Sequence, residues 1–381
     1  MLDAGDIQAA CALYDGLRLR AGNICISPLS VRMAFGLCYS GARDRTADEL
    51  REVFRFPGPR ETIDRFATLL HAFASRDARL AALANAPWDD TAADPTLRIA
   101  SRLWAAAGHP LLEDFAQTAR DAFGAPVEQL NFAGDPEGSR ATINGSIEKF
   151  THGKIVELIA QGQLDTATKL VVTVAAYLRA RWEVTFRKEL TRNAPFFSPR
   201  GAVEVPLMEH VAHHPYGELR DIRVLDLDYE QGDVAMRIAV GREEGALARS
   251  EAVASELLAL PLRDARIRLF LPRFRCESSL TLENVLSPMG LKAIFRYGDA
   301  DLSGMDGTRD LYVSAAVHQA YVDVDELGTE AAAATALMGR AGASLRRPED
   351  PIEVRVDRPF LFWILDRPTG TVLFEGRVVA P

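Results

Sequence analysis

The chain has 381 residues, of which 48% are hydrophobic and 25% are charged, which is typical of a water-soluble globular protein. Its 53 acidic and 44 basic residues give a net charge of −9, which argues against nucleic-acid and anionic-membrane partners. No apolar stretch approaches the ~18 residues that a membrane-spanning helix needs.

The N-terminal residues and the cysteines both favour a cytoplasmic protein. Asp3 and Asp6 stand where a secretory signal would carry positive charge, and no apolar run follows them. We therefore expect a cytoplasmic location, with release to the extracellular space by an unconventional route as the alternative. The four cysteines are too few and too widely spaced for a disulfide framework or a zinc site, so we expect buried free thiols. These are Cys11, Cys25, Cys38 and Cys276.

The first half of the chain is predicted to be mainly helical. Ser27 followed by Pro28 is a typical helix start, because serine caps the first turn and proline fits its first position. Val31, Phe35 and Cys38 then fall on one face of that helix. Further helical patterns cover residues 46–54, 61–73, 112–122 and 140–151.

The second half is predicted to consist mainly of strands. Alternating or continuous apolar runs rich in β-branched residues cover residues 203–208, 222–229, 234–240, 266–274 and 321–326. The last thirty residues predict two or three more strands, joined by a turn at residues 367–370. Because helices are segregated from strands and no low-complexity linker interrupts the chain, we predict one α+β domain over residues 1–381.

Residues 328–350 do not fit this arrangement of regular elements. The sequence GTEAAAATALMGRAGASLRRPED is small, polar and without an apolar face, although it lies between two predicted strands. An Ala-rich surface helix followed by a loop is one interpretation. The alternative is a segment that enters a sheet, because every second residue from Thr329 is uncharged and most are small. That inward set is Thr329, Ala331, Ala333, Thr335, Leu337, Gly339 and Ala341.

Motifs for catalysis and metal binding are weak. The chain has no P-loop, no Gly-rich dinucleotide turn, no nucleophile elbow and no HExxH helix. His210, His213 and His214 lie close together after a predicted strand, but no carboxylate or cysteine completes a metal site, so a solvated loop is favoured. Asn144 begins a glycosylation sequon, but it falls within a predicted helix and is expected to be unmodified. We therefore predict that the protein is not an enzyme.

Several blocks of the sequence resemble motifs of one protein family, and they occur along the chain in the same order as in that family. VHQAYVDVDELGTEAAAATA (317–336) resembles the strand-and-hinge motif of the serpins, and VRVDRPFLFWI (354–364) resembles their C-terminal signature. NICISPLSVRMAF (23–35) is similar to an N-terminal serpin helix, and residues 166–186 are similar to the central strand with its breach tryptophan, Trp182. The phrase FRKELTRNAPFF (186–197) is more similar to intracellular poxviral serpins than to plasma serpins.

The serpin resemblance implies both a fold and an activity. The fold is a single domain of three β-sheets and about nine helices, with an exposed reactive-centre loop at about residues 326–350. The activity is inhibition of a serine-type endopeptidase as a suicide substrate. The protease attacks the loop and forms an acyl-enzyme, and the cut loop then inserts into the main sheet and distorts the protease before deacylation. No catalytic residue, cofactor or metal is implied.

The resemblance also assigns roles to individual residues. The hinge comprises Glu326, Gly328, Thr329, Glu330, Ala331, Ala332, Ala333 and Ala334. The polar residues beneath the sheet-opening region, called the shutter, are Ser27, Ser30 and His318, and Trp182 belongs to the breach. The family usually has Asn where this chain has Val174, which leaves the set of shutter hydrogen bonds incomplete.

The reactive-site bond is assigned by counting from the hinge. The family's usual spacing places it between Gly342 and Ala343, and a spacing one residue shorter places it between Ala341 and Gly342. Small residues there favour a small-residue-specific protease as the target. The alternative is a trypsin-like protease, because three arginines lie nearby, Arg340, Arg346 and Arg347.

Other functions compatible with this family stay open. Some serpins act as carriers, chaperones or storage proteins, and others are cross-class inhibitors, which inhibit cysteine proteases in place of serine proteases. The uncharged inward face of the hinge favours inhibition over a non-inhibitory role. We expect a monomer without a heparin site, a nucleic-acid partner or a membrane partner.

Overall fold

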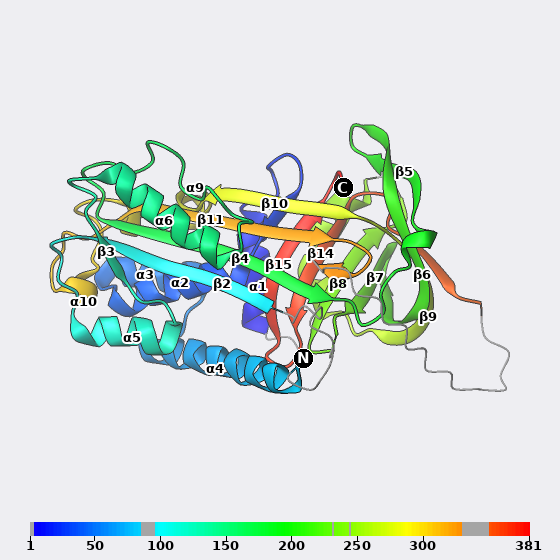
Figure 1. Cartoon of the computed structure of the whole chain (residues 1–381), viewed down its shortest axis with the longest axis horizontal. Coiled ribbons are helices and arrows are strands. Elements are labelled where there is room, and N and C mark those ends of the chain that lie inside the picture. The colour runs from blue at the N-terminus through cyan, green and yellow to red at the C-terminus, as the bar shows by residue number, and fades with distance from the viewer. Residues whose placement is uncertain (1–3, 85–95, 231, 244, 330–349) are drawn as a thin grey trace.

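The computed structural model describes residues 4–84, 96–230, 232–243, 245–329 and 350–381, and Figure 1 shows the whole chain. Among these residues, no helix is long and apolar enough to cross a membrane. The helices are α1 (Ala4–Asp15), α2 (Pro28–Gly41), α3 (Asp44–Phe54), α4 (Pro59–Ala84), α5 (Glu113–Phe123), α6 (Pro136–Phe150), α7 (Ala246–Ala252), α8 (Ala254–Ala259), α9 (Leu282–Met289), α10 (Ser303–Asp306) and the 3₁₀ turns η1 (Lys188–Leu190) and η2 (Ala293–Phe295).

Strands make up most of the second half of the chain. They are β1 (Ile24–Ile26), β2 (Thr96–Ala106), β3 (Glu128–Leu130), β4 (Leu170–Arg181), β5 (Arg192–Ser198), β6 (Gly201–Leu219), β7 (Ile222–Asp228), β8 (Val234–Gly241), β9 (Arg263–Pro272), β10 (Phe274–Thr281), β11 (Val313–Val324), β12 (Gly328–Thr329), β13 (Ile352–Arg355), β14 (Phe360–Asp366) and β15 (Thr371–Val378). Helices and strands thus occupy largely separate stretches of sequence, which confirms the α+β prediction.

Local sequence signals account for where the helices begin. The Ser27 hydroxyl accepts a hydrogen bond from the backbone N–H of Ser30, and Pro28 is the first residue of α2. Asp135 caps α6 in the same way, since its Oδ1 accepts from the Gly138 N–H at 2.8 Å. The four other predicted helices are also confirmed, although α4 continues from the predicted end at residue 73 to Ala84.

Six strands form the sheet that contains the hinge. Their order is β10-β11-β12-β4-β2-β3, and β11 also pairs directly with β4. This direct pairing is parallel and joins residues 170–177 of β4 to residues 313–321 of β11. We call it the seam. The predicted strand over residues 321–326 ends earlier, at Val324, because the chain turns back there into β12.

The remaining strands form a nine-stranded sheet of order β1-β15-β14-β8-β7-β6-β9-β13, with β5 added to β6. The resemblance implied three sheets, but hydrogen bonding joins the described strands into two. The reason is the 19-residue length of β6, which pairs with β5 near its start, with β9 along its middle and with β7 at its end.

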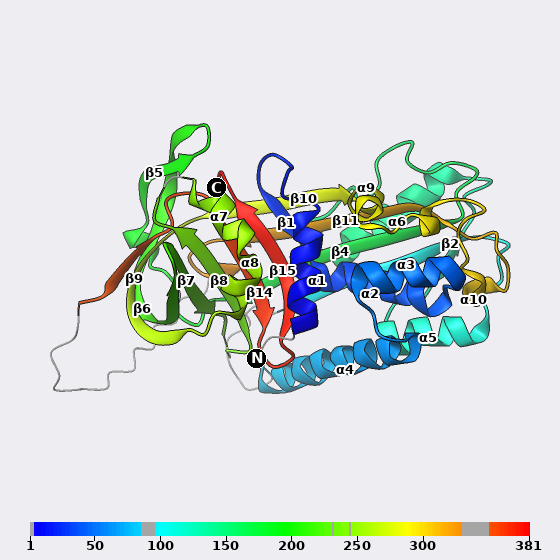
Figure 2. The ribbon, with the colours of Figure 1, turned by 180° about the vertical axis from the view of Figure 1, so that it is seen from behind.

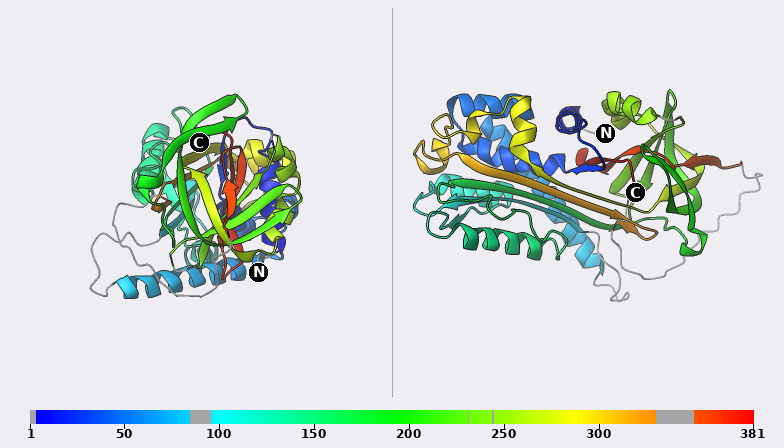
Figure 3. Two further views of the ribbon diagram at one scale, coloured as in Figure 1. Left: turned by 90° about the vertical axis from the view of Figure 1, so that its right-hand side faces the viewer. Right: turned by 90° about the horizontal axis from the view of Figure 1, so that it is seen from above.

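Helices cover both faces of the six-stranded sheet. α6 lies across one face, whereas α1, α2 and α3 lie on the opposite side (Figures 1, 2 and 3). The larger hydrophobic cluster joins α1 and α2 to both sheets and includes Phe35, Val174 and Phe362. A separate, smaller cluster lies beneath α6 and includes Ile147 and Val317. The six-stranded sheet therefore has one face against the main core and one face under a single helix.

Candidate functional site

The hinge begins as a short strand between the ends of β11 and β4. After Val324 the chain turns, and Asp325 closes the turn by accepting hydrogen bonds from the N–H groups of Leu327, at 2.8 Å, and Gly328. Thr329 of β12 then pairs antiparallel with Val324 on one side and with Ala180 on the other. The first residues of the hinge thus already separate β11 from β4 at this end of the seam.

The Thr329 side chain points into the core beside the breach tryptophan. It is completely buried, and its Oγ1 lies 2.6 Å from the hydroxyl oxygen of Tyr229. The Tyr229 ring stacks on Trp182 with 4.4 Å between ring centroids. Trp182 also holds the turn, because its Nε1–H donates to the Asp325 carbonyl at 3.0 Å and its backbone N–H donates to the Leu327 carbonyl. Burial raises the pKa of Tyr229, so its hydroxyl stays protonated at neutral pH.

Glu326 fixes the start of the hinge through an ion pair. Its carboxylate is almost fully buried and accepts hydrogen bonds from Arg273, with Nη2–Oε1 at 2.6 Å, and from Thr191 at 2.6 Å. Burial by itself would raise the pKa of Glu326, but these hydrogen bonds lower it overall. Because the Arg273 side chain is 43% exposed, water screens the pair and limits its contribution to stability.

Residue 328 must be glycine because the backbones of β12 and β4 approach each other closely there. A Cβ at this position would lie 2.1 Å from the Ala180 carbonyl oxygen and 2.6 Å from the Arg181 Cα. Both obstacles are backbone atoms that cannot rotate away. Any other residue here would push β12 out of the gap between β4 and β11.

The three shutter residues meet under the middle of the seam, all completely buried. The Ser27 N–H donates to His318 Nε2 at 3.1 Å, and the Ser27 and Ser30 hydroxyl oxygens are 2.6 Å apart. His318 Nδ1 lies 3.0 Å from the Val174 carbonyl oxygen. Since Nε2 accepts a hydrogen bond, it carries no proton, so the donor to Val174 is Nδ1–H and the imidazole is neutral. Burial lowers the pKa of His318 to about 4.

The main chain supplies the contact that the Val174 side chain cannot make. Val174 is directly opposite His318 in the seam, and its carbonyl accepts a hydrogen bond from His318 Nδ1–H. Ser101 of β2 extends the network by donating to the Ser30 carbonyl at 3.0 Å. The hydrogen bond between His318 and Val174 crosses the seam, so separating the two strands breaks it.

Sequence reasoning missed four residues of this site, Ser101, Thr191, Tyr229 and Arg273. Tyr229 lies 100 residues from Thr329, and Arg273 lies 53 residues from Glu326. None of the four carries a local signal, because their partners meet only after the sheets form. The hinge residues Glu330, Ala331, Ala332, Ala333 and Ala334 and the predicted bait residues lie outside the described residues.

The histidine cluster lies in a strand, which corrects the expectation of a solvated loop. His210 and His214 are both buried in β6, with their Nε2 atoms 2.9 Å apart, whereas exposed His213 contacts Asp264. The alternation of a strand explains this split, since residues 210 and 214 share one face and residue 213 takes the other. Within the described part of the chain, no three His, Cys, Asp or Glu side chains are grouped to bind a metal.

Two further expectations concern single residues. Asn144 is buried in α6, and its side-chain amide is used in hydrogen bonds to residues 158 and 159, so the sequon asparagine is not presented to solvent. The four cysteines are free thiols, of which Cys25, Cys38 and Cys276 are buried and Cys11 is half-buried.

Comparisons with known proteins agree over nearly the whole chain. A family model described as serpin (serine protease inhibitor) matches residues 6–381. A leukocyte elastase inhibitor of Equus caballus is 34% identical, with 94% of this chain and 93% of the relative covered. An uncharacterised serpin-like protein of Thermococcus kodakarensis is 33% identical, covering 97% of this chain and 83% of the relative. The crystal structure of Serpin48 of the insect Tenebrio molitor superposes with a TM-score of 0.84 at 28% identity, covering 99% of this chain and 98% of that one.

Proposed function

The chain belongs to the serpin family, and from this premise we propose that it inhibits a serine protease as a suicide substrate. Membership in a family of protease inhibitors also confirms the predictions of a serpin fold and of a protein that is not an enzyme. The proposal for this chain rests chiefly on one observation, the wedge that β12 forms between β11 and β4.

The register of the sheet supports insertion of the cut loop. Thr329 pairs with Val324 of β11 and with Ala180 of β4, two residues that are 144 positions apart in the sequence. His318 and Val174, which pair directly in the seam, are also 144 positions apart, so both pairs belong to the same register. A strand that continues from Thr329 would therefore replace the pairing of the seam in register as far as Ala315 and Val171, where an irregularity between Val313 and Ala315 shifts the pairing of β11 by one residue. It would bring Thr335 between His318 and Val174, and Gly339 beside Leu170 at the end of β4.

The side-chain pattern supports the same path. Thr329 faces the core, so a continuing strand alternates from it and sends Ala331, Ala333, Thr335 and Leu337 inward. None of these side chains is charged, so none would be costly to bury. The inserted strand would gain ladder hydrogen bonds on both edges that an exposed loop lacks.

Trapping requires that insertion is faster than hydrolysis of the acyl-enzyme. The serine hydroxyl of the protease attacks the scissile carbonyl, which forms an ester with the hinge side and releases the C-terminal side as a free amine. The hinge side then enters the seam and carries the protease with it, and distortion of the protease prevents water from completing the reaction. We place the bond at Gly342–Ala343, three residues beyond the Gly339 position, with Ala341–Gly342 as the shorter alternative.

An elastase-like protease with a small primary pocket is the proposed target. Small residues surround the proposed bond, and relatives 34% identical are named leukocyte elastase inhibitors. Arg340, Arg346 and Arg347 are cleavage sites for trypsin-like enzymes, which we expect to cut the loop without being trapped. We further propose that the inhibitor is a monomer that needs neither heparin nor another cofactor.

The test is incubation with a panel of elastase-like, subtilisin-like and trypsin-like serine proteases, analysed on denaturing gels. A complex that survives denaturation is expected with a small-pocket enzyme. The released C-terminal peptide should begin at Ala343 or Gly342 by mass. A stable complex whose peptide begins at Ala341, Arg347 or Pro348 would instead make the protein a trypsin-type inhibitor, and the absence of a complex with every enzyme would overturn inhibition.

A further inference from the structure

The segment between α6 and β4 lies over the seam, on the face opposite the shutter. We call residues 151–169 the cover segment. Its apolar side chains Ile155, Leu158, Ile159 and Leu164 belong to the smaller hydrophobic cluster. That cluster also contains Val171 and Ala175 of β4 and Val317 of β11. The cover segment therefore shares one cluster with both strands of the seam.

This packing resists separation of β4 and β11. A strand inserted between them would move them apart by about 4.8 Å, the spacing of neighbouring strands. Ala175 and Val317 sit next to the Val174–His318 pair, so this displacement would divide the cluster at its middle. Buried apolar side chains lose their contacts when they are separated by much less than this distance. The cover segment must therefore shift before or while a strand enters.

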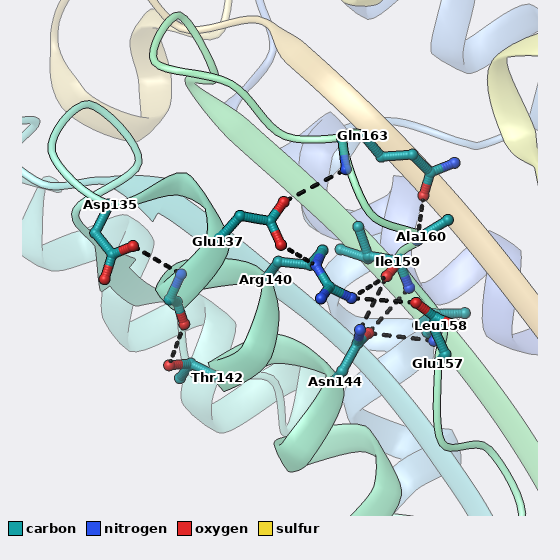
Figure 4. A network of polar contacts seen from close by, with 12 residues as sticks. Asp135, Glu137, Arg140, Thr142, Asn144, Glu157, Leu158, Ile159, Ala160 and Gln163 are labelled. Carbon is teal, nitrogen blue, oxygen red and sulfur yellow. Dashed lines mark hydrogen bonds and ion pairs between the residues drawn. The ribbon is translucent and has the colours of Figure 1, made fainter.

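A group of polar side chains on α6 holds the cover segment in place (Figure 4). Asn144 Oδ1 accepts from the N–H groups of Ile159, at 2.9 Å, and Leu158, at 3.2 Å, while its Nδ2 donates to the Ile159 carbonyl at 2.9 Å. Arg140 adds an Nη1–H bond to the same carbonyl at 3.3 Å and an ion pair with Glu157 at 3.2 Å. We call Asn144 and Arg140 the polar clamp.

The polar clamp has a buried part and an exposed part. Asn144 is only 8% exposed, and its side chain satisfies two backbone N–H groups that would otherwise be unpaired next to the hydrophobic cluster. Glu137, one turn before Arg140, accepts from Arg140 Nε at 2.8 Å and orients its guanidinium. Asn144 should therefore contribute more than Arg140, whose ion pairs are partly exposed to water.

We propose that the polar clamp sets the rate at which the seam opens, and that Asn144 is its main positioning residue. The proposal rests on the proposed function for its consequence in inhibition, but opening itself is a property of the uncleaved protein. Without Asn144, the cover segment detaches more readily from the seam. The seam then opens faster, the cut loop inserts sooner, and a larger fraction of protease is trapped before the acyl bond is hydrolysed.

The first experiment measures opening without any protease. Amide hydrogen exchange in the seam, at residues 170–177 and 313–321, is compared between the full-length protein and its Asn144→Ala variant. Loss of the clamp should speed exchange there about tenfold, the effect of roughly 1.4 kcal/mol. Exchange in β14 and β15 should not change. Arg140→Gln should give a smaller increase at the same positions.

Thr142→Ala is the matched control on the same helix. Thr142 is exposed, and its hydroxyl donates only to the Gly138 carbonyl within α6 (Figure 4). It should leave the exchange of the seam unchanged. If Asn144→Ala fails to fold, Asn144→Asp keeps the Oδ1 acceptor and loses the bond to the Ile159 carbonyl, and it should still give a measurable increase in seam exchange.

The second experiment separates the polar clamp from inhibition. Each variant is incubated with the protease that the unmodified protein traps, and the trapped fraction is measured. Faster seam exchange with a higher trapped fraction supports the proposal. Unchanged seam exchange in Asn144→Ala, or an equal increase in both sheets, overturns it even if the protein is an inhibitor. Faster seam exchange in a protein that traps no protease supports the clamp and overturns the proposed function alone.

Discussion

The two sheets of this molecule are built differently at their centres. In the nine-stranded sheet, β14 lies between β8 and β15 with antiparallel pairing on both edges, and all seven of its residues are buried. In the six-stranded sheet, β4 and β11 meet in a parallel seam, a pairing that is slightly less stable per residue. One end of that seam is already separated by β12. The difference teaches that any capacity to accept a strand belongs to the six-stranded sheet. We call the nine-stranded sheet the frame.

Cleavage of the loop should have the largest effect, because it tests the seam directly. A cut between Leu337 and Pro348 should let the hinge side insert. Roughly ten new ladder hydrogen bonds at about 1 kcal/mol each would raise the melting temperature by about 20 °C, at about 2 °C per kcal/mol. Calorimetry of intact and cleaved protein measures this. An equal or lower melting temperature after a clean cut would mean that neither sheet accepts the cut loop as a strand. That result would favour a non-inhibitory serpin.

The second prediction places a charge at the entry point of the seam. Thr329 is fully buried against Tyr229, so Thr329→Arg would bury an unpaired guanidinium if β12 stayed in place. Insertion should slow, and the fraction of protease trapped should fall about tenfold or more, since burying such a charge costs several kcal/mol. Denaturing gels give the ratio of complex to cleaved inhibitor.

Thr329→Ser is the control for that substitution, because it keeps the hydroxyl that meets Tyr229. It should trap protease nearly as well as the unmodified protein. Unchanged trapping by Thr329→Arg would show that insertion of the loop does not require the side chain at residue 329 to face the core.

The third prediction uses pH to weaken the middle of the seam. Burial lowers the pKa of His318 to about 4 in the folded protein, from an ordinary value of 6.5. A histidine with a depressed pKa stabilises the fold fully above pH 6.5, and this contribution is lost as the pH falls toward 4. The loss approaches about 3 kcal/mol, at about 1.36 kcal/mol per pKa unit. Denaturant unfolding between pH 7 and pH 4 measures it.

A neutral replacement isolates the contribution of His318 from that of other groups. His318→Gln cannot be protonated in this range, so the variant should show a shallower decline in the free energy of unfolding. The buried His210, whose pKa is lowered to about 3, is present in both proteins and should leave a common residual slope. Identical slopes would exclude His318 as the titrating group.

The smallest effect is expected in the frame. Glu375 of β15 is buried, with one oxygen accepting from Trp363 Nε1 at 2.9 Å and no partner for Oε2 among the described residues. Burial raises its pKa to about 8, so the contribution of Glu375 to stability is greatest below pH 4.5 and is lost as the pH rises toward 8. At pH 6, Glu375→Gln should therefore stabilise the protein by about 2 kcal/mol. Trapping of protease should not change, and a changed trapped fraction would show that the frame takes part in insertion.

Much of the architecture was predictable because its signals are local. Serine followed by proline predicted the start of α2, and periodic apolar residues predicted five of the helices. The strand signals were equally direct for β7, β8 and the C-terminal strands. Boundaries were less reliable where tertiary contacts decide them. Continued helix between residues 73 and 84 and the 19-residue length of β6 have no local marker in the sequence.

The sequence by itself indicated the family, which the comparisons confirm, and it carries the uncharged, alternating pattern on which the hinge assignment rests as a prediction. Only the tertiary structure decided that Tyr229 meets Thr329, that Arg273 pairs with Glu326 and that the Val174 carbonyl completes the shutter. It also decided that the cover segment packs on both strands of the seam. The physical reason is distance along the chain. A periodic pattern repeats within a few residues, whereas each of these contacts joins segments that become neighbours only when the sheets assemble.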